Sequence, residues 1–413
     1  MVKQLIKNGL VVDGNGGEPK KDHVVVTEND QIVYVGPESG YSVTGKEIVV
    51  DAADGTILPG MIDTHVHMML EYSPVSQRLE TPFSFMYYQA AEYLKNTLQA
   101  GVTSVRDALG TDLGVKKAVE EGLIPGPRLQ LSINALTITG GHGDGYQVSG
   151  NELDLMPSGY PGMPSGKCDG VAEVRKKTRE MLRAGAEVIK VHATGGVLSA
   201  TDHPEFTQFS LDELKAIVEE GRFRKGVKVM AHAQGAEGIK NAVRAGIHSI
   251  EHGIFIDDEA VELMLENGTY LVPTLLAPVA VLETAEETGM PDTAVQKSKE
   301  VIEAHKASFT KAYKAGVKIA MGTDAGVMKH GTNLRELGLM VDAGMAPMDS
   351  IVATTKTAAE CLGWDDKVGT LEQGKLADII VVKGNPLEDI YSLANNDNIQ
   401  VVIKNGKVEK NIL

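Results

Sequence analysis

The sequence has 413 residues, which is enough for a (β/α)8 barrel of about 250 residues together with a smaller additional domain. Hydrophobic residues make up 42% of the chain and charged residues 23%, so the composition argues against a disordered or fibrous protein. The 40 Lys and Arg residues stand against 56 Asp and Glu residues, and the formal net charge is −16. Nucleic acid is therefore not an expected partner, because an acidic surface repels phosphate backbones.

The cysteine content and the hydropathy of the chain indicate an ordinary intracellular environment. Cys168 and Cys361 are the two cysteines, and they form no Cys-x-x-Cys pair, which disfavours a disulfide scaffold or a thiolate zinc site. The start of the sequence, MVKQLIKNGLVVDGNGGEPK, has no apolar core of a signal peptide. No later stretch approaches the ~18 apolar residues of a membrane span. We expect a cytoplasmic protein with no membrane partner.

Both ends of the chain have the pattern of short strands. Runs of Val, Ile and Tyr bounded by Gly, Asn and Asp occur between residues 7 and 50 and return in 374–387 and 398–410. The middle of the chain has a different rhythm. We therefore predict a small β-sandwich domain formed by residues 1–56 and 364–413, with a catalytic barrel of residues 57–363 between them.

The centre alternates apolar runs with segments of helical composition. The helical segments include 171–186, 210–226 and 236–246, and each ends near a glycine, as helices tend to do. This alternation predicts an α/β fold, a (β/α)8 TIM-type barrel, with an open doubly wound sheet as the alternative. The predicted strands are residues 56–67, 101–107, 127–134, 186–193, 226–233, 246–253, 269–274 and 316–324.

Polar residues stand at the carboxyl ends of several of these strands, where a buried parallel strand should be apolar. Each residue alone is more often a hydrogen-bonded core residue than a ligand. Together they would meet at one mouth of the barrel, and imidazole with carboxylate suits zinc or a similar divalent ion. The residues are His65, His67, Lys190, His232, His252 and Asp324.

These positions resemble the amidohydrolase superfamily, in the subtype whose two metals are bridged by a carbamylated lysine. The resemblance includes GMIDTHVH around His65 and His67 and GTDAG around Asp324. Closer similarity is to the imidazolonepropionase-related dipeptidases, a branch with prolidases, Xaa-Arg or Xaa-Lys carboxypeptidases and ochratoxin-type amide hydrolases. The motifs are TGGH (139–142), ATGGV (193–197), AHAQG (231–235), EHG (251–253) and GTLEQGKLADIIVV (369–382).

The resemblance implies a site with two divalent metal ions, for which zinc is the default. His65, His67 and Asp324 would hold the first ion. His232 and His252 would hold the second, and Lys190 would bridge the pair as N6-carboxylysine. An unmodified ammonium at that position would repel both cations, whereas burial favours the neutral amine that can react with carbon dioxide.

The resemblance also implies catalytic roles. Asp324 would accept a proton from the metal-bridging hydroxide that attacks the amide, and would then pass it to the leaving nitrogen. His142 lies in a glycine-rich loop after the third strand and would hydrogen-bond the substrate carbonyl or its oxyanion, although a histidine facing solvent is the alternative.

Four further residues are weaker candidates for substrate binding. Gln234 could contact a substrate carboxylate, and His192 shares a strand face with Lys190 but could equally serve packing. Tyr72 and His330 lie in loops after the first and eighth strands. The long segment 140–170 is rich in Gly and Pro and could cover the active site or support a contact between subunits.

The predicted function is hydrolysis of an amide bond in a small molecule with a free carboxylate, such as a dipeptide or an N-acyl amino acid, by a homo-oligomer. A cyclic-amide hydrolase of the imidazolonepropionase type is the alternative within the superfamily. A non-enzymatic metal-binding scaffold is the alternative from another class, and it is disfavoured because every predicted ligand position is occupied by a suitable residue.

Overall fold

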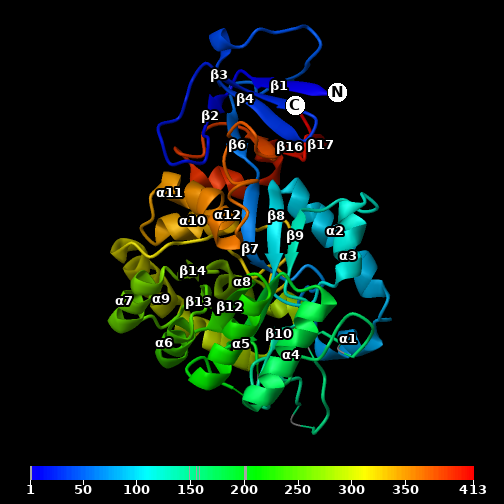
Figure 1. Ribbon diagram of the computed structural model, residues 1–413, viewed down its shortest axis with the longest axis vertical. Helices are drawn as coiled ribbons and strands as arrows, with labels where there is room; N and C mark the ends of the chain where they lie inside the picture. Colours follow the sequence, from blue (N-terminus) through cyan, green and yellow to red (C-terminus); the bar gives the residue numbers. More distant parts are fainter. Residues whose placement is uncertain (1, 148, 155, 158, 200–201) are drawn as a thin grey trace.

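Strands from both ends of the chain lie together at one end of the molecule, and the α/β part forms the rest (Figure 1). The computed structural model describes residues 2–147, 149–154, 156–157, 159–199 and 202–413. The terminal strands form a four-stranded sheet of order β4-β3-β1-β5 and a five-stranded sheet of order β17-β16-β15-β6-β2. Their bounds are β1 Lys3–Lys7, β2 Leu10–Val11, β3 His23–Glu28, β4 Gln31–Pro37, β5 Ile48–Asp51, β6 Thr56–Pro59, β15 Ile379–Val382, β16 Ile399–Lys404 and β17 Lys407–Asn411.

One hydrophobic cluster joins these two sheets. Ile6 and Val25 come from the four-stranded sheet, and Ile57, Ile379 and Val401 come from the five-stranded sheet; all are fully buried. Burying an aliphatic side chain of this size stabilises a fold by about 1.5–3 kcal/mol. The two ends of the chain therefore share a core.

The centre is built from parallel strands whose residues are almost all buried. β7 to β9 form a three-stranded sheet, and β10 to β14 form a five-stranded sheet. Burial on both faces explains why these strands read as nearly continuous apolar runs. Their bounds are β7 Met61–Val66, β8 Val102–Asp107, β9 Arg128–Leu131, β10 Ala135–Leu136, β11 Val188–His192, β12 Lys228–Ala233, β13 Ser249–His252 and β14 Tyr270–Val272.

Two predicted strands differ from expectation. Residues 56–67 divide at Gly60 into β6, which pairs with β15, and β7, which pairs with β8. A Cβ atom at Gly60 would collide with Thr103, so the chain can pass this point only with glycine. Residues 316–324 form no continuous strand. Isolated bridges link Ile319 to Leu271 and Ala325, the residue after the segment, to Val66. The left-handed backbone of Asp324 (φ 66°) interrupts regular pairing.

The helices surround these strands, and the predicted segments 171–186, 210–226 and 236–246 correspond to α4, α5 and α6. Ser210 and Glu213 form a capping box at the start of α5, and Gly185 and Gly246 end α4 and α6 in the left-handed conformation. The α-helices are α1 Val75–Glu80, α2 Phe85–Gln99, α3 Leu113–Glu120, α4 Gly170–Ala184, α5 Leu211–Phe223, α6 Ala236–Ala245, α7 Asp258–Asn267, α8 Leu276–Thr288, α9 Asp292–Ala315, α10 Arg335–Asp342, α11 Pro347–Ala353 and α12 Lys356–Leu362. Short 3-10 helices occur at Glu38–Gly40, Ile390–Ala394 and Asn396–Asn398.

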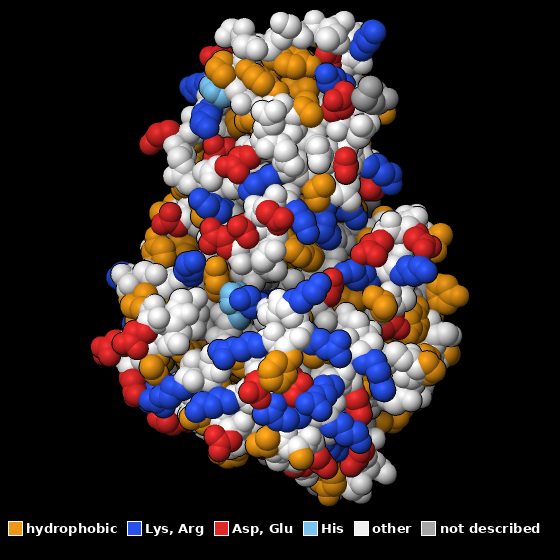
Figure 2. Space-filling model, in the orientation of Figure 1, with side chains coloured by type: hydrophobic (Ala, Val, Ile, Leu, Met, Phe, Trp, Pro, Cys, Tyr) orange, Lys and Arg blue, Asp and Glu red, His pale blue; other side chains and the backbone are white. Residues whose placement is uncertain are grey.

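The surface mixes charges of both signs. Figure 2 shows Lys and Arg side chains interspersed with Asp and Glu over the helices of this face, although the net charge is negative. Some of these charges pair across helices, for example Arg175 with Glu220 at 3.0 Å and Arg179 with Glu220 at 2.7 Å. In the described part of the chain, every helix is too short or too polar to cross a lipid bilayer.

Candidate functional site

A cavity of about 190 Å³ lies at the carboxyl ends of the central strands. This end of the strands faces away from the terminal sheets (Figure 1). The polar residues singled out at the strand ends all reach its wall, whereas much of the remaining wall is apolar. The cavity is lined, among others, by His65, His67, Lys190, His232, His252 and Asp324. The strand ends therefore do meet, as the barrel prediction requires.

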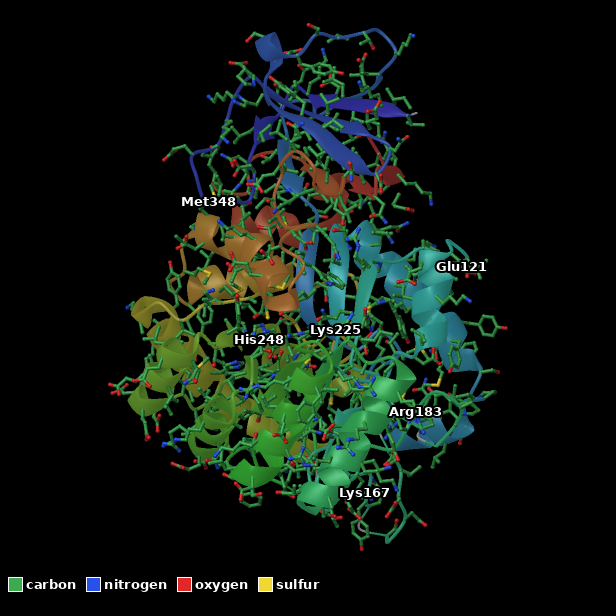
Figure 3. The ribbon with its side chains drawn as sticks, viewed as in Figure 1. Glu121, Lys167, Arg183, Lys225, His248 and Met348 are labelled. Carbon is green, nitrogen blue, oxygen red and sulfur yellow. The ribbon has the colours of Figure 1, made fainter. Side chains whose placement is uncertain are left out.

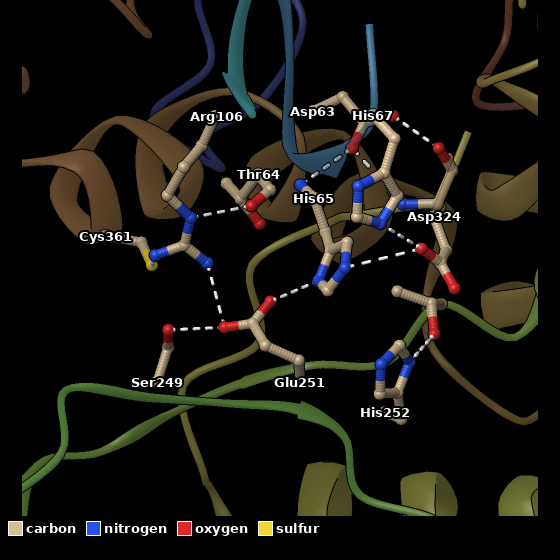
Figure 4. A network of polar contacts seen from close by, with 12 residues as sticks. Asp63, Thr64, His65, His67, Arg106, Ser249, Glu251, His252, Asp324 and Cys361 are labelled. Atoms are coloured by element: carbon tan, nitrogen blue, oxygen red, sulfur yellow. Dashed lines mark hydrogen bonds and ion pairs between the residues drawn. The ribbon is translucent and has the colours of Figure 1, made fainter. Parts of the chain in front are cut away.

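His65, His67 and Asp324 form the tightest group of candidate ligands (Figure 4). Their potential ligand atoms all lie within 4.8 Å of one another. Asp324 Oδ1 is 2.9 Å from His67 Nε2 and 3.4 Å from His65 Nε2. Burial alone would raise the pKa of Asp324, but the contacts with both imidazoles lower it well below its usual value. The carboxylate is therefore ionised, which is the form that binds a cation.

His232 and His252 continue this group on the neighbouring strands. Parallel pairing of β12 with β13 sets Ala233 beside His252, and the two imidazole centroids are 4.6 Å apart. His252 also lies 5.1 Å, between ring centroids, from His65. Burial lowers the pKa of both His232 and His252 well below the usual value, so both rings are neutral and able to donate a lone pair.

Each of the four imidazoles has one ring nitrogen held by a group outside the set of candidate ligands. His65 Nδ1 donates to Glu251 at 2.7 Å, and His67 Nδ1 donates to the carbonyl of Leu109 at 3.2 Å. His232 Nε2 donates to the carbonyl of Gly195 at 2.9 Å, and His252 Nδ1 hydrogen-bonds with Thr274 Oγ at 2.7 Å. Ring nitrogens held in this way fix the orientation of a ligand histidine and leave the other nitrogen for a metal. This donor set fits a divalent cation.

Lys190 lies at the same cavity and is 2% exposed. Burial lowers the pKa of its amine to about 8, although Glu251 and Asp324 act in the opposite direction. A buried lysine in this condition is uncommon unless it is paired or modified. Its burial in the same cavity wall as the candidate ligands therefore calls for a chemical explanation.

Comparison with known proteins agrees with this geometry. Residues 56–408 match the model of the amidohydrolase family. The chain belongs to the amidohydrolase family. This amidohydrolase is 34% identical to ochratoxinase from Aspergillus niger, over 98% of this chain and 86% of that protein. The resemblance inferred from the motifs is confirmed, and so is the prediction of a hydrolase that acts on carbon–nitrogen bonds.

Two solved structures are similar over nearly their whole length. One is a Xaa-Pro dipeptidase with bound methionine in the active site (38% identity, 98% of this chain and 99% of that one, TM-score 0.88). The other is a prolidase complexed with N-methylphosphonate-L-proline (33% identity, 100% of both chains, TM-score 0.92). The fold of the amidohydrolase is accordingly a TIM-barrel-like α/β fold.

A buried ion pair beneath His65 was not predicted. Glu251 accepts from His65 and lies 3.0 Å from Arg106 Nη2, and Ser249 Oγ donates to it at 2.5 Å (Figure 4). Arg106 also donates to the carbonyl of Thr64 at 2.7 Å. Burial would raise the pKa of Glu251, but Arg106 and His65 lower it to about 2. Two features of the sequence could have indicated this ion pair. Arg106 is a charged residue inside an apolar strand, and Glu251 is an acid directly before His252.

His142 lines the cavity beside His232. Its ring stacks on that of His232, with centroids 4.3 Å apart, and its Nδ1 lies 3.0 Å from Ser199 Oγ and 3.4 Å from Asp202 Oδ2. A Cβ atom at Gly196 would collide with the ring. Glycine at 196 is therefore needed for this placement. The sequence carried no clear signal for Ser199 or Asp202.

The weaker substrate candidates divide into two groups. His192, Gln234 and Tyr72 line the cavity. His192 Nδ1 and Gln234 Oε1 are buried and have no hydrogen-bond partner in the part of the chain that the structure describes. His330 does not line the cavity: its Nε2 donates to the carbonyl of Leu70 at 2.7 Å, and its ring stacks on Tyr93. The structure thus gives His330 a packing position.

The segment 140–170 contributes to the wall of the cavity. Gly143, Met156, Ser165 and Lys167 are among its lining residues. Figure 3 shows Lys167 at the end of the molecule opposite the terminal sheets. This position favours the interpretation of the segment as a cover of the active site. Residues 148, 155 and 158 of the segment lie outside the described residues.

Proposed function

We propose that the protein is a binuclear metal-dependent hydrolase that cleaves the amide bond of a dipeptide or an N-acyl amino acid by attack of hydroxide. The main support is the meeting of His65, His67, Lys190, His232, His252 and Asp324 in one cavity. The similarity to ochratoxinase and to a Xaa-Pro dipeptidase supports a substrate with an amide bond.

In this proposal, His65, His67 and Asp324 hold one divalent cation and His232 and His252 hold the other. Zinc suits imidazole and carboxylate ligands. The cations would polarise the substrate carbonyl and lower the pKa of water from 15.7 to about 7, so that hydroxide is available for attack. Lys190 would carry a carboxyl group on its amine, since an ammonium so close to two cations would repel them.

Asp324 would move the proton that amide cleavage requires. Both imidazole contacts of Asp324 use Oδ1, so Oδ2 is available for a second task. We assign to it acceptance of the proton of the attacking water and delivery of that proton to the leaving nitrogen. His142 would hydrogen-bond the substrate carbonyl through Nε2, since Ser199 and Asp202 occupy its Nδ1 side.

Removal and return of metal test this function. Zinc-loaded protein is expected to release free amino acid from members of a panel of Xaa-Pro, Xaa-Arg and Xaa-Phe dipeptides. The product would be detected by ninhydrin after chromatographic separation from the uncleaved dipeptide. Chelation should abolish the release, and about two equivalents of zinc should restore it. A cyclic-amide hydrolase would release no free amino acid. Full activity after complete removal of the metal would contradict the proposal.

The state of Lys190 can be measured directly. Protein reconstituted with zinc in ¹³C-labelled bicarbonate should show a carbamate carbon in its ¹³C NMR spectrum. The signal should be missing from Lys190→Gln, and that variant should bind less than the full complement of zinc. Lys240→Gln is a suitable control, because Lys240 is also largely buried but pairs with Asp257 at 3.0 Å. Equal spectra for wild type and Lys190→Gln would refute carboxylation.

Four further features remain predictions. These are the β-sandwich formed by residues 1–56 and 364–413, the catalytic barrel of residues 57–363, the homo-oligomer and the cytoplasmic location. The shared hydrophobic cluster of the two terminal sheets supports the first of them.

A further inference from the structure

The proposed substrate carries a carboxylate into a cavity with largely apolar walls. Leu109, Met156, Ala277 and Val281 are among the lining residues. Removing a carboxylate from water is costly unless a cation or several hydrogen-bond donors receive it. The question is therefore which lining residue takes this charge. Among the described lining residues, the Lys and Arg side chains are Arg78, Lys167 and Lys190.

Two of these cations have other tasks. Lys167 Nζ is 2.7 Å from Asp144 Oδ1 and 3.3 Å from Glu152 Oε1, so its charge is already balanced. Lys190 lies with the candidate metal ligands and, under the proposed function, carries a carboxyl group. Neither is suited to balance the charge of an incoming carboxylate.

Arg78 has a position suited to this task. It lies on α1, in the segment that follows β7, and it is half-buried in the cavity wall near Tyr72. Burial lowers the pKa of Arg78, and burial raises the pKa of Tyr72, so the phenol is neutral at pH 7. A half-buried guanidinium gains from an anion in the cavity, and its planar donors match both oxygens of a carboxylate.

We propose that Arg78 binds the free carboxylate of the substrate and thereby selects carboxylate-bearing amides. This inference rests on the proposed function for the nature of the substrate. Gln234, which the sequence offered as a carboxylate contact, has a neutral amide. It could donate a hydrogen bond, but it could not balance the charge.

Calorimetric binding to the zinc-loaded protein tests the assignment without turnover. The probes are L-methionine and 3-(methylthio)propylamine, which is the same molecule without its carboxylate. Wild type is expected to bind L-methionine more tightly. Arg78→Gln should weaken L-methionine binding about 10- to 100-fold, the range of a charge-assisted hydrogen-bonded contact, and leave the amine unaffected.

Two further variants control the result. Lys167→Gln removes a cation from the same wall and should leave the ratio of the two affinities unchanged, because Asp144 and Glu152 already balance that charge. Arg78→Lys retains a charge but loses the planar fork, so it should lie between wild type and Arg78→Gln. It also preserves the test if Arg78→Gln fails to fold.

The inference is overturned if L-methionine binds wild type and both Arg78 variants equally, or if wild type does not prefer L-methionine to the amine. The dipeptide panel separates this failure from failure of the proposed function. Hydrolysis unaffected by Arg78→Gln contradicts only the role of Arg78. Discrimination between the two probes in a protein that cleaves no amide contradicts only the proposed reaction.

Discussion

Asp324→Asn is expected to reduce kcat by about 10² to 10⁴-fold, the range that general acid–base catalysis contributes. The variant retains an amide oxygen close to His65 and His67, but it cannot accept and return a proton at neutral pH. The Asp324 carboxylate is ionised, as its lowered pKa indicates, and its Oδ2 is available to take up a proton. Turnover of the best dipeptide from the panel is the measurement, in protein whose zinc content matches that of wild type.

Matched metal content is the decisive control for this variant, because Asp324 is also a proposed ligand. Asp365→Asn changes an exposed carboxylate and should leave kcat unaffected. If zinc-replete Asp324→Asn turned over at the wild-type rate, the assignment of proton transfer to Asp324 would be wrong. If activity fell only in proportion to lost zinc, Asp324 would be a ligand without that role.

Arg106→Met is expected to reduce the free energy of unfolding by about 3–5 kcal/mol, because it leaves the charge of Glu251 buried without its partner. Arg106 and Glu251 are both at most 1% exposed, with Nη2 and Oε1 3.0 Å apart. The double variant Arg106→Met, Glu251→Gln removes both charges and retains an acceptor for His65. The double variant should recover much of the lost free energy of unfolding. Urea unfolding of metal-free protein would measure this recovery.

An exposed ion pair supplies the comparison. Arg335 Nη2 is 2.8 Å from Glu283 Oε1, and both side chains are more than one third exposed. Arg335→Met should therefore change the free energy of unfolding by less than about 1 kcal/mol. If Arg106→Met were no more costly than Arg335→Met, the buried pair would contribute no more to stability than an exposed one. Metal-free protein is used because bound zinc would itself stabilise the fold.

The local pattern of the chain was enough for much of the architecture. The apolar runs at β11, β12 and β13, the helices α4 to α6 and the paired strands at both ends follow from periodicity and from turn and capping residues. The candidate ligands could also be found, because His65, His67 and Lys190 interrupt strands that should be apolar. Each of these signals lies within a few residues of the feature that it predicts.

The sequence did not reveal how the first and eighth predicted strands depart from regular pairing. The division at Gly60 depends on Thr103, and the bridges of the 316–324 segment depend on β7 and β14. Strand periodicity reports which residues are buried, but it does not report which neighbour supplies the hydrogen bonds. These features require the neighbouring strands to be in place.

By itself the sequence determined the residue types at the strand ends, and with them a site rich in imidazole and carboxylate groups. Only the tertiary structure decided which partners contact these groups: Glu251 and Arg106 lie beneath His65, and Asp202 lies beside His142. It also placed Arg78 in the cavity wall. His65 and Glu251 are 186 positions apart in the chain. The physical reason is that periodicity encodes burial within one element, whereas the side-chain contacts between distant elements arise when the strands and helices pack together.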